Sequence, residues 1–296
     1  MSLKPARELF CAARSQGYAL GYFESWNLES LQGVLDAAEA THSPVIIGFN
    51  GEFLTHPERM AQERIQLYGA LGRAAAESAS VPCGLMFNEC ASDDFLQKAV
   101  TEGFNLVMLA DPAASYEDYE RRVRNLVRLA HEYGAAVEAE LDELPTGSTG
   151  NVSTEHSSFT DPDLAARFID VTGVDLLSVS VGNVHVMVKG THALDLDRLA
   201  AIRQRIELPL GLHGGSGISP DSLRTAIQMG VVKVAYGTYL KQRYLSAVCQ
   251  ALKNPEINPH ILLGMGGPED VMLCGRRAVR DAVLERIELL GCCGRA

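Results

Sequence analysis

Short apolar runs alternate with longer amphipathic segments along almost the whole chain. The apolar runs are rich in β-branched residues and lack strict alternation with polar residues, which is typical of strands buried on both faces of a parallel sheet. They predict eight strands, at residues 18–23, 44–50, 81–88, 105–110, 135–141, 176–182, 208–213 and 231–238. Amphipathic segments of helical period separate these strands, and a further helical segment is predicted at residues 267–290.

Eight strand–helix units in strict order favour an α/β fold of the (β/α)8 type, a TIM barrel, with an extra C-terminal helical segment. A doubly wound open sheet is the structural alternative. A glycine-rich turn after the seventh strand favours the closed barrel, because such barrels commonly hold phosphate at that position. The chain has no low-complexity segment, so residues 1–296 are predicted to form a single domain.

The stretch 208–217, with the sequence LPLGLHGGSG, carries the most distinctive local pattern. Its apolar run ends at His213 and continues into Gly214, Gly215 and Ser216. A glycine-rich turn at a helix start exposes backbone N–H groups and the positive end of the helix dipole, which together bind phosphate. An ordinary left-handed turn is the alternative, and the place of the turn in the predicted barrel favours phosphate binding.

Composition narrows the possible partners. The net charge of −11 over 296 residues argues against nucleic acid or an anionic membrane as the main partner. No apolar run approaches the ~20 residues of a membrane span, and the N-terminus lacks a signal-peptide pattern. Seven cysteines without CxxC spacing indicate reduced thiols, so a cytoplasmic location is expected.

Chemistry in such a barrel lies at the carboxyl ends of the strands, where this chain has many polar residues. They are Glu24, Asn50, Asn88, Glu89, Cys90, Asp111, Asn183, His185 and His213. On the fifth strand, Glu138 and Glu140 share one parity, so both are predicted to face the barrel interior. Interior carboxylates require cations or a metal. The sequence leaves two interpretations of these carboxylates open: a structural ion pair with Lys233, or a role in the site.

Several motifs together resemble the class II, metal-dependent fructose-bisphosphate and tagatose-bisphosphate aldolases, nearly from end to end. They are GYALGYFESWNLESLQ, SPVIIG, VEAEL, TGVDLLSVSVGNVH, LPLGLHGGSGI and the terminal GCCGRA. The resemblance implies a divergent lyase that performs retro-aldol cleavage of a ketose bisphosphate or a related phosphorylated sugar. It also implies zinc as a Lewis acid.

The resemblance assigns roles to individual residues. His185 and His213 are expected to bind a divalent metal, zinc, with Asn88 at the position of a third ligand. Glu138 and Glu140 are expected beside the metal as an acidic pair. Phosphate and substrate are expected at Asn50, Gly182, Gly214, Gly215, Ser216 and Thr238, with a monovalent cation near the phosphate. A homodimer or homotetramer is expected by analogy with the family.

The chain departs from the family where the chemistry takes place. The family's third strand ends in His-X-Asp-His, and we match this motif to Leu85, Met86, Phe87 and Asn88. In this match Phe87 replaces the acid/base aspartate, and Asn88 replaces a histidine ligand. Loss of a general acid alone costs roughly 10²–10⁴-fold in rate, so ordinary fructose-bisphosphate cleavage is not expected.

Other substitutions bring carboxylates to the same end of the barrel. Glu24 and Ala235 each stand where the family has asparagine, and Asp111 follows the position of a family aspartate. We hypothesise that Glu89 or Glu24 replaces the missing base, or that a carboxylate completes a harder metal site.

Three functions therefore compete. A metal-dependent lyase is favoured, because it explains both the histidine pair and the carboxylate pair. A non-catalytic relative that binds phosphorylated sugars is the second. The third is metal-free chemistry, either sugar-phosphate isomerisation or a Schiff base on Lys233.

Overall fold

The computed structural model describes residues 2–141, 159–184, 190–253 and 258–296. Its strands are parallel and pair in chain order, and the last pairs with the first, so that the sheet closes into a barrel. They are β1 (Leu20–Glu24), β2 (Val45–Asn50), β3 (Cys83–Cys90), β4 (Leu106–Leu109), β5 (Ala136–Glu140), β6 (Leu176–Ser178), β7 (Leu210–Leu212) and β8 (Val231–Tyr236). The predicted TIM barrel is confirmed, while the single-domain assignment stays a prediction.

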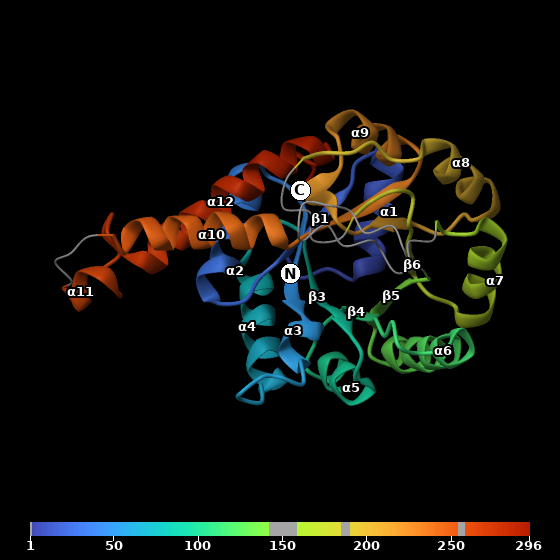
Figure 1. Ribbon diagram of the computed structural model, residues 1–296, viewed down its shortest axis with the longest axis horizontal. Helices are drawn as coiled ribbons and strands as arrows, with labels where there is room; N and C mark the ends of the chain where they lie inside the picture. The colour runs from blue at the N-terminus through green and yellow to red at the C-terminus, as the bar shows by residue number, and fades with distance from the viewer. Residues whose placement is uncertain (1, 142–158, 185–189, 254–257) are drawn as a thin grey trace.

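Helices surround this barrel (Figure 1). They are α1 (Ala6–Gln16), α2 (Leu28–Ala40), α3 (Gly51–Thr55), α4 (Ile65–Ser78), α5 (Asp93–Thr101), α6 (Tyr116–Glu132), α7 (Pro162–Thr172), α8 (Leu196–Arg205), α9 (Pro220–Gln228), α10 (Thr238–Ala251), α11 (Pro259–Leu262) and α12 (Val271–Leu290), with a short 3-10 helix η1 (Gly215–Gly217). Helix α12 is the predicted additional C-terminal segment. It packs against α2 and α10, and α10 and α12 extend together away from the barrel (Figure 1).

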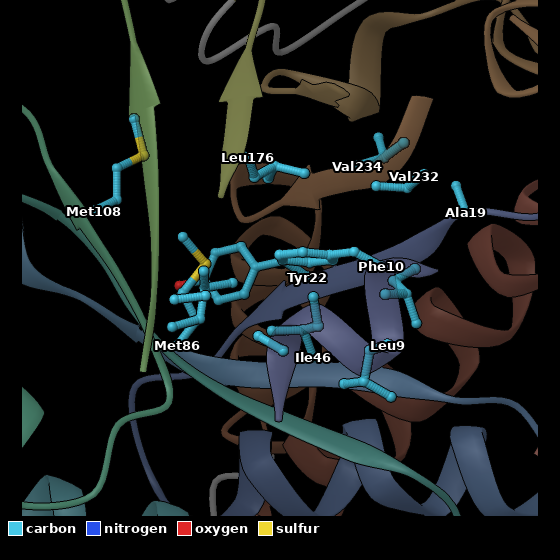
Figure 2. Close-up of a cluster of buried hydrophobic side chains, with 14 of the residues drawn as sticks. Leu9, Phe10, Ala19, Tyr22, Ile46, Met86, Met108, Leu176, Val232 and Val234 are labelled. Atoms are coloured by element: carbon cyan, nitrogen blue, oxygen red, sulfur yellow. The ribbon is translucent and has the colours of Figure 1, made fainter. Parts of the chain in front are cut away.

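Helix α1 is an element that the sequence interpretation lacks. Its residues Leu9 and Phe10 are buried and belong to a cluster with Tyr22, Ile46 and Met86 (Figure 2). The helix contacts β1, β3 and β8. Since Leu9 lies against Gly84, near the start of β3, α1 closes the end of the barrel where the strands begin.

Side-chain caps fix the turns that leave the carboxyl ends of the strands. Asn50 ends β2 and accepts a hydrogen bond from the backbone of Phe53, so it also caps α3. Ser92 follows β3 and caps α5 through the backbone N–H of Phe95. Such caps satisfy N–H groups that the first helical turn leaves without partners. The caps therefore fix the first turns of α3 and α5 next to the ends of β2 and β3.

None of the helices formed by the described residues is long and apolar enough to cross a membrane.

Candidate active site

Two cavities open at the carboxyl ends of the strands. The smaller, of about 400 Å³, is lined by residues that include Glu24, Asn50, Asn88, Glu89, His213 and Lys241. The larger, of about 840 Å³, is lined by residues that include Glu89, Met108, Asp111, Tyr119 and Glu140. Because Glu89 lines both, it stands at the boundary between them. Most of the polar residues predicted at strand ends are thus brought to one region.

A chain of charged side chains crosses the barrel interior beneath the smaller cavity. Nδ1 of His213 lies 2.7 Å from Oε1 of Glu89, and its Nε2 lies 2.9 Å from Oε1 of Glu138. Nζ of Lys233 donates to both oxygens of Glu138, at 2.9 and 2.7 Å. The hydroxyl of Ser178 donates to Oε1 of Glu138 at 2.6 Å. The ion pair between Glu138 and Lys233 is confirmed.

The electrostatics of this chain keep it ionised. Burial opposes ionisation of Glu138, but Lys233 and His213 outweigh it and lower the pKa of Glu138 to about 2. Burial and Lys233 both disfavour the charged form of His213. Glu140, Glu138 and Glu89 outweigh them and raise the pKa of His213 to about 10. The imidazole then carries a proton on each nitrogen and donates to both neighbouring carboxylates.

Glu140 behaves differently although it lies two residues further along the same strand. Its Oε1 is buried and has no hydrogen-bond partner within the described part of the chain. Burial raises its pKa to about 7, against the attraction of His213 and with repulsion from Glu89 and Glu138. It lines the larger cavity. A carboxyl group with a pKa near neutrality can exchange a proton with a bound molecule.

The end of β3 differs from the sequence expectation. Phe87 is fully buried and packs against Phe104, with ring centroids 5.3 Å apart. It lines neither of these two cavities. The pairing with β4 is irregular between Phe87 and Cys90, and Glu89 has a φ of 50°. This irregularity turns both Asn88 and Glu89 toward the smaller cavity, so the expectation that Phe87 stands at the acid/base position is wrong.

From this strand end, Glu89 rather than Asn88 contacts His213. The Nδ2 of Asn50 donates to Oε2 of Glu89 at 2.6 Å, which fixes the carboxylate from the other side. Asn88 also lines the smaller cavity, and its buried Oδ1 has no hydrogen-bond partner among the described residues.

The glycine-rich turn after β7 borders the smaller cavity, as expected. Gly214 has a φ of 68°, which favours glycine, and lines this cavity together with Ser216 and Thr238. Gly215 begins η1 and is tightly enclosed, since a Cβ built on it would lie 2.5 Å from Cγ1 of Val234. Gly182, with a φ of 93°, lines neither cavity found in the described residues.

Lys241, one turn into α10, is a lining residue that the sequence interpretation missed. Its Nζ lies 2.5 Å from Oε1 of Glu24 and 3.8 Å from the ring centroid of Phe53. Burial raises the pKa of Glu24, although Lys241 lowers it. Lys241 lies three residues after Thr238, and residues i and i+3 share one face of a helix. This spacing is the sequence signal that Lys241 lines the same cavity as Thr238.

The arrangement around His213 suits a metal ligand. A metal-ligating histidine usually donates the N–H of its second nitrogen to a carboxylate or carbonyl. Glu138 supplies this acceptor at Nε2. Nδ1, on losing its proton to the metal's competition, and the carboxylate of Glu89 would then be neighbouring ligand atoms. His185 lies outside the described residues. Within those residues, no group of three or more His, Cys, Asp or Glu side chains is arranged to hold a metal.

Comparison with known proteins decides the family. The profile of the fructose-bisphosphate aldolase class II family matches residues 4–295. The chain belongs to this family. It is 32% identical over 284 residues to YdjI of Escherichia coli K12, described as uncharacterised, and 31% identical over 316 residues to a fructose-bisphosphate aldolase of Thermus caldophilus. These matches cover 96% and 98% of this chain, and the same shares of the two relatives.

Solved structures agree with this membership. The crystal structure of the YdjI aldolase from Escherichia coli K12 has a TM-score of 0.80 at 31% identity and covers 99% of both chains. The fructose-bisphosphate aldolase of Campylobacter jejuni has a TM-score of 0.76 at 21% identity, covers 98% of this chain and 94% of its own, and supports the fold alone.

Proposed function

We propose that this protein is a metal-dependent aldehyde-lyase that cleaves a phosphorylated ketose by a retro-aldol reaction. The observation that carries the proposal is the pair of carboxyl groups on β5. Glu138 contacts the imidazole of His213 and has a pKa lowered to about 2, whereas Glu140 has a pKa raised to about 7 and lines the larger cavity. Two carboxylates with separated pKa values divide the roles of positioning and proton transfer between them.

The metal would be held by His213 and Glu89, with His185 as the third ligand proposed from the sequence. A divalent ion there would polarise the substrate carbonyl and stabilise the enediolate. With a carboxylate among its ligands, the site favours a harder ion than an all-histidine site does. Thus Glu89, rather than Asn88, takes the place of the family's third histidine, and the strand-end motif corresponds to Met86, Phe87, Asn88 and Glu89.

In this corrected register Asn88 replaces the acid/base aspartate, and an amide cannot transfer a proton. A retro-aldol reaction needs one group that removes the proton from the hydroxyl beside the breaking bond. It also needs a proton for the carbon that is released. Glu140 has the pKa for this exchange, whereas the low pKa of Glu138 keeps it a positioning residue.

The phosphate of the substrate would bind in the smaller cavity. Gly214 and Ser216 from the turn after β7, and Thr238 and Lys241 from the start of α10, all line it. Backbone N–H groups at a helix start and one lysine form an anion site. Its position beside His213 would place the phosphorylated end of the ketose next to the metal.

The test combines metal content with turnover. Elemental mass spectrometry of purified wild type should find about one equivalent of divalent metal, and the variants His213→Ala and Glu89→Ala should lose it. Glu132→Gln, on the exposed face of α6, is the control and should keep it. Cleavage of a ketose phosphate that stops on chelation and returns with metal completes the test. Wild type that takes up no metal after reconstitution would contradict the proposal.

A non-catalytic phosphosugar-binding protein is the second candidate, favoured by Asn88 at the acid/base position. It predicts thermal stabilisation by sugar phosphates without turnover. Schiff-base chemistry on Lys233 has less support, because this lysine is fully buried, contacts Glu138 and lines neither cavity of the described residues. Borohydride with substrate should therefore trap no adduct.

A further inference from the structure

The larger cavity differs in charge from the smaller one. Glu52 and Glu89 line both cavities. The smaller cavity adds Glu24 and its partner Lys241, whereas the larger adds Asp111 and Glu140, and none of its described lining residues is a lysine or an arginine. The guanidinium of Arg122 donates to Asp111 at 2.6 Å, but Arg122 is not itself a lining residue. A second phosphate group here would therefore face carboxylates, with no lysine or arginine in the described lining.

One lining residue has a polar atom without a partner, which indicates a ligand that donates hydrogen bonds. Oε1 of Glu140 is buried and accepts no hydrogen bond from any described residue. A buried acceptor without a partner costs stability until a donor reaches it. Glu140 lines the cavity, so a rotation of its carboxyl group would bring this oxygen to a bound molecule whose hydroxyl or ammonium groups supply the donor.

The rest of the lining suits an uncharged chain. Met108, Ala110, Tyr116, Tyr119 and Leu141 provide apolar and aromatic surface, and the volume is about 840 Å³, twice that of the smaller cavity. Carbon-bound hydrogens of a polyol can pack on such surface while its hydroxyl groups reach the carboxylates. The cavity thus has space for the part of a sugar beyond its phosphorylated end.

We propose that the substrate is a ketose monophosphate. Its phosphate binds in the smaller cavity, and its other end, which bears hydroxyl or amine donors and no second phosphate, binds in the larger cavity. This inference rests on the proposed function and names its substrate class. It excludes ketose bisphosphates as good ligands, because like charges brought together in a partly closed site oppose binding.

The experiment measures binding rather than turnover, so that it is independent of catalysis. Calorimetry measures the binding affinity of three non-cleavable ligands for metal-loaded wild type. They are a hexitol 1-phosphate, its 6-amino-6-deoxy analogue and the hexitol 1,6-bisphosphate, and each is tested as a set of epimers. The two monophosphates should bind at least about tenfold more tightly than the bisphosphate. Equal or tighter binding of the bisphosphate, or binding of none of the three, would overturn the inference.

A matched pair of variants locates the effect. Ala113→Lys adds a cation at the exposed rim of the larger cavity, and Ala61→Lys adds one at an exposed position outside both linings. Ala113→Lys should tighten bisphosphate binding by about threefold or more relative to monophosphate binding. Ala61→Lys should leave this ratio unchanged, and equal ratios in both variants would contradict the assignment of the second end to this cavity.

The experiments distinguish a wrong substrate class from a wrong lyase activity. If the monophosphates bind with the expected preference but no ketose monophosphate is cleaved by metal-loaded protein, the substrate class stands and the lyase activity is wrong.

Discussion

Glu138 and Glu140 lie two residues apart on β5 and face the same interior, yet their pKa values shift in opposite directions. Glu138 is fully buried, and Glu140 is half-buried with its Oε1 covered. Glu138 is held by Lys233, His213 and Ser178, and its pKa falls to about 2. Glu140 has an oxygen without a partner among the described residues, and its pKa rises to about 7. The comparison shows that partners from other strands, and not burial alone, decide the charge of a buried carboxyl group.

The same contrast extends to the two cavities. Both cavities are lined by Glu52 and Glu89. The smaller also includes the start of α10 and Lys241, which pairs with Glu24, whereas the larger adds Asp111, Glu140 and apolar surface. In the proposed function, the phosphate site therefore lies next to a cavity whose described lining has no lysine or arginine. This difference would orient a substrate with one phosphorylated end.

Glu140→Gln should have the largest effect on activity of the changes that test the contrast between Glu138 and Glu140. If Glu140 transfers the proton, kcat should fall by about 10²–10⁴-fold while metal content is kept. Steady-state kinetics on the cleaved substrate checks this, with Glu132→Gln as the surface control. A loss in kcat no greater than that of the control would remove Glu140 from the mechanism.

Lys233→Met should be the most destabilising change in the ion-pair chain. It leaves Glu138 buried with one cation fewer, which costs about 3–5 kcal/mol of unfolding free energy. Urea denaturation measures this loss. The double variant Lys233→Met, Glu138→Gln should recover much of it, because the uncompensated charge is gone, and a double variant less stable than the single one would contradict the account.

The two carboxyl groups should respond oppositely to pH in chelator-treated protein. Glu140 has a folded-state pKa raised from 4.5 to about 7, so its stabilisation is complete below pH 4.5 and is lost as pH rises through 7. Relative to Glu140→Gln, wild type should lose about 3 kcal/mol between pH 4.5 and pH 8. Glu138, with a pKa of about 2, contributes stability that disappears only as pH falls from 4.5 through 2. Denaturation across this range checks both, and a flat difference for Glu140→Gln would be inconsistent with the raised pKa.

Gly215→Ala tests the phosphate site in the smaller cavity and should have the smallest effect of these changes. Its Cβ would lie 2.5 Å from Val234 and 3.0 Å from the carbonyl oxygen of Ala235. The crowding should destabilise the protein by about 1–3 kcal/mol and weaken binding of inorganic phosphate. Calorimetry and urea denaturation measure both effects. Gly267→Ala, where a Cβ meets nothing within 4 Å, is the matched control.

Much of the fold could be predicted from the sequence because the signals are local. Each strand is a short apolar run, and the parity of Glu138 and Glu140 correctly indicates that both face inward. The position of the glycine turn at the smaller cavity also followed from the order of the strands.

The details of the site could not be predicted, because they depend on contacts between distant residues. A non-glycine residue with positive φ, such as Glu89, leaves no mark in the sequence pattern, so the match of the family's motif to residues 85–88 stood one residue out of register. Nor does the sequence VEAEL distinguish the two glutamates. Lys233 lies 95 residues beyond Glu138, and only the closed barrel shows that it meets the first and not the second.

The most direct test of the opposite states of Glu138 and Glu140 is an infrared difference titration of chelator-treated protein between pH 5 and pH 9. Wild type should show the carbonyl band of a buried protonated carboxyl group that disappears with a midpoint near pH 7, and Glu140→Gln should lack this band. Absence of the band in wild type, or its persistence in Glu140→Gln, would contradict the assignment of the titrating carboxyl group to Glu140.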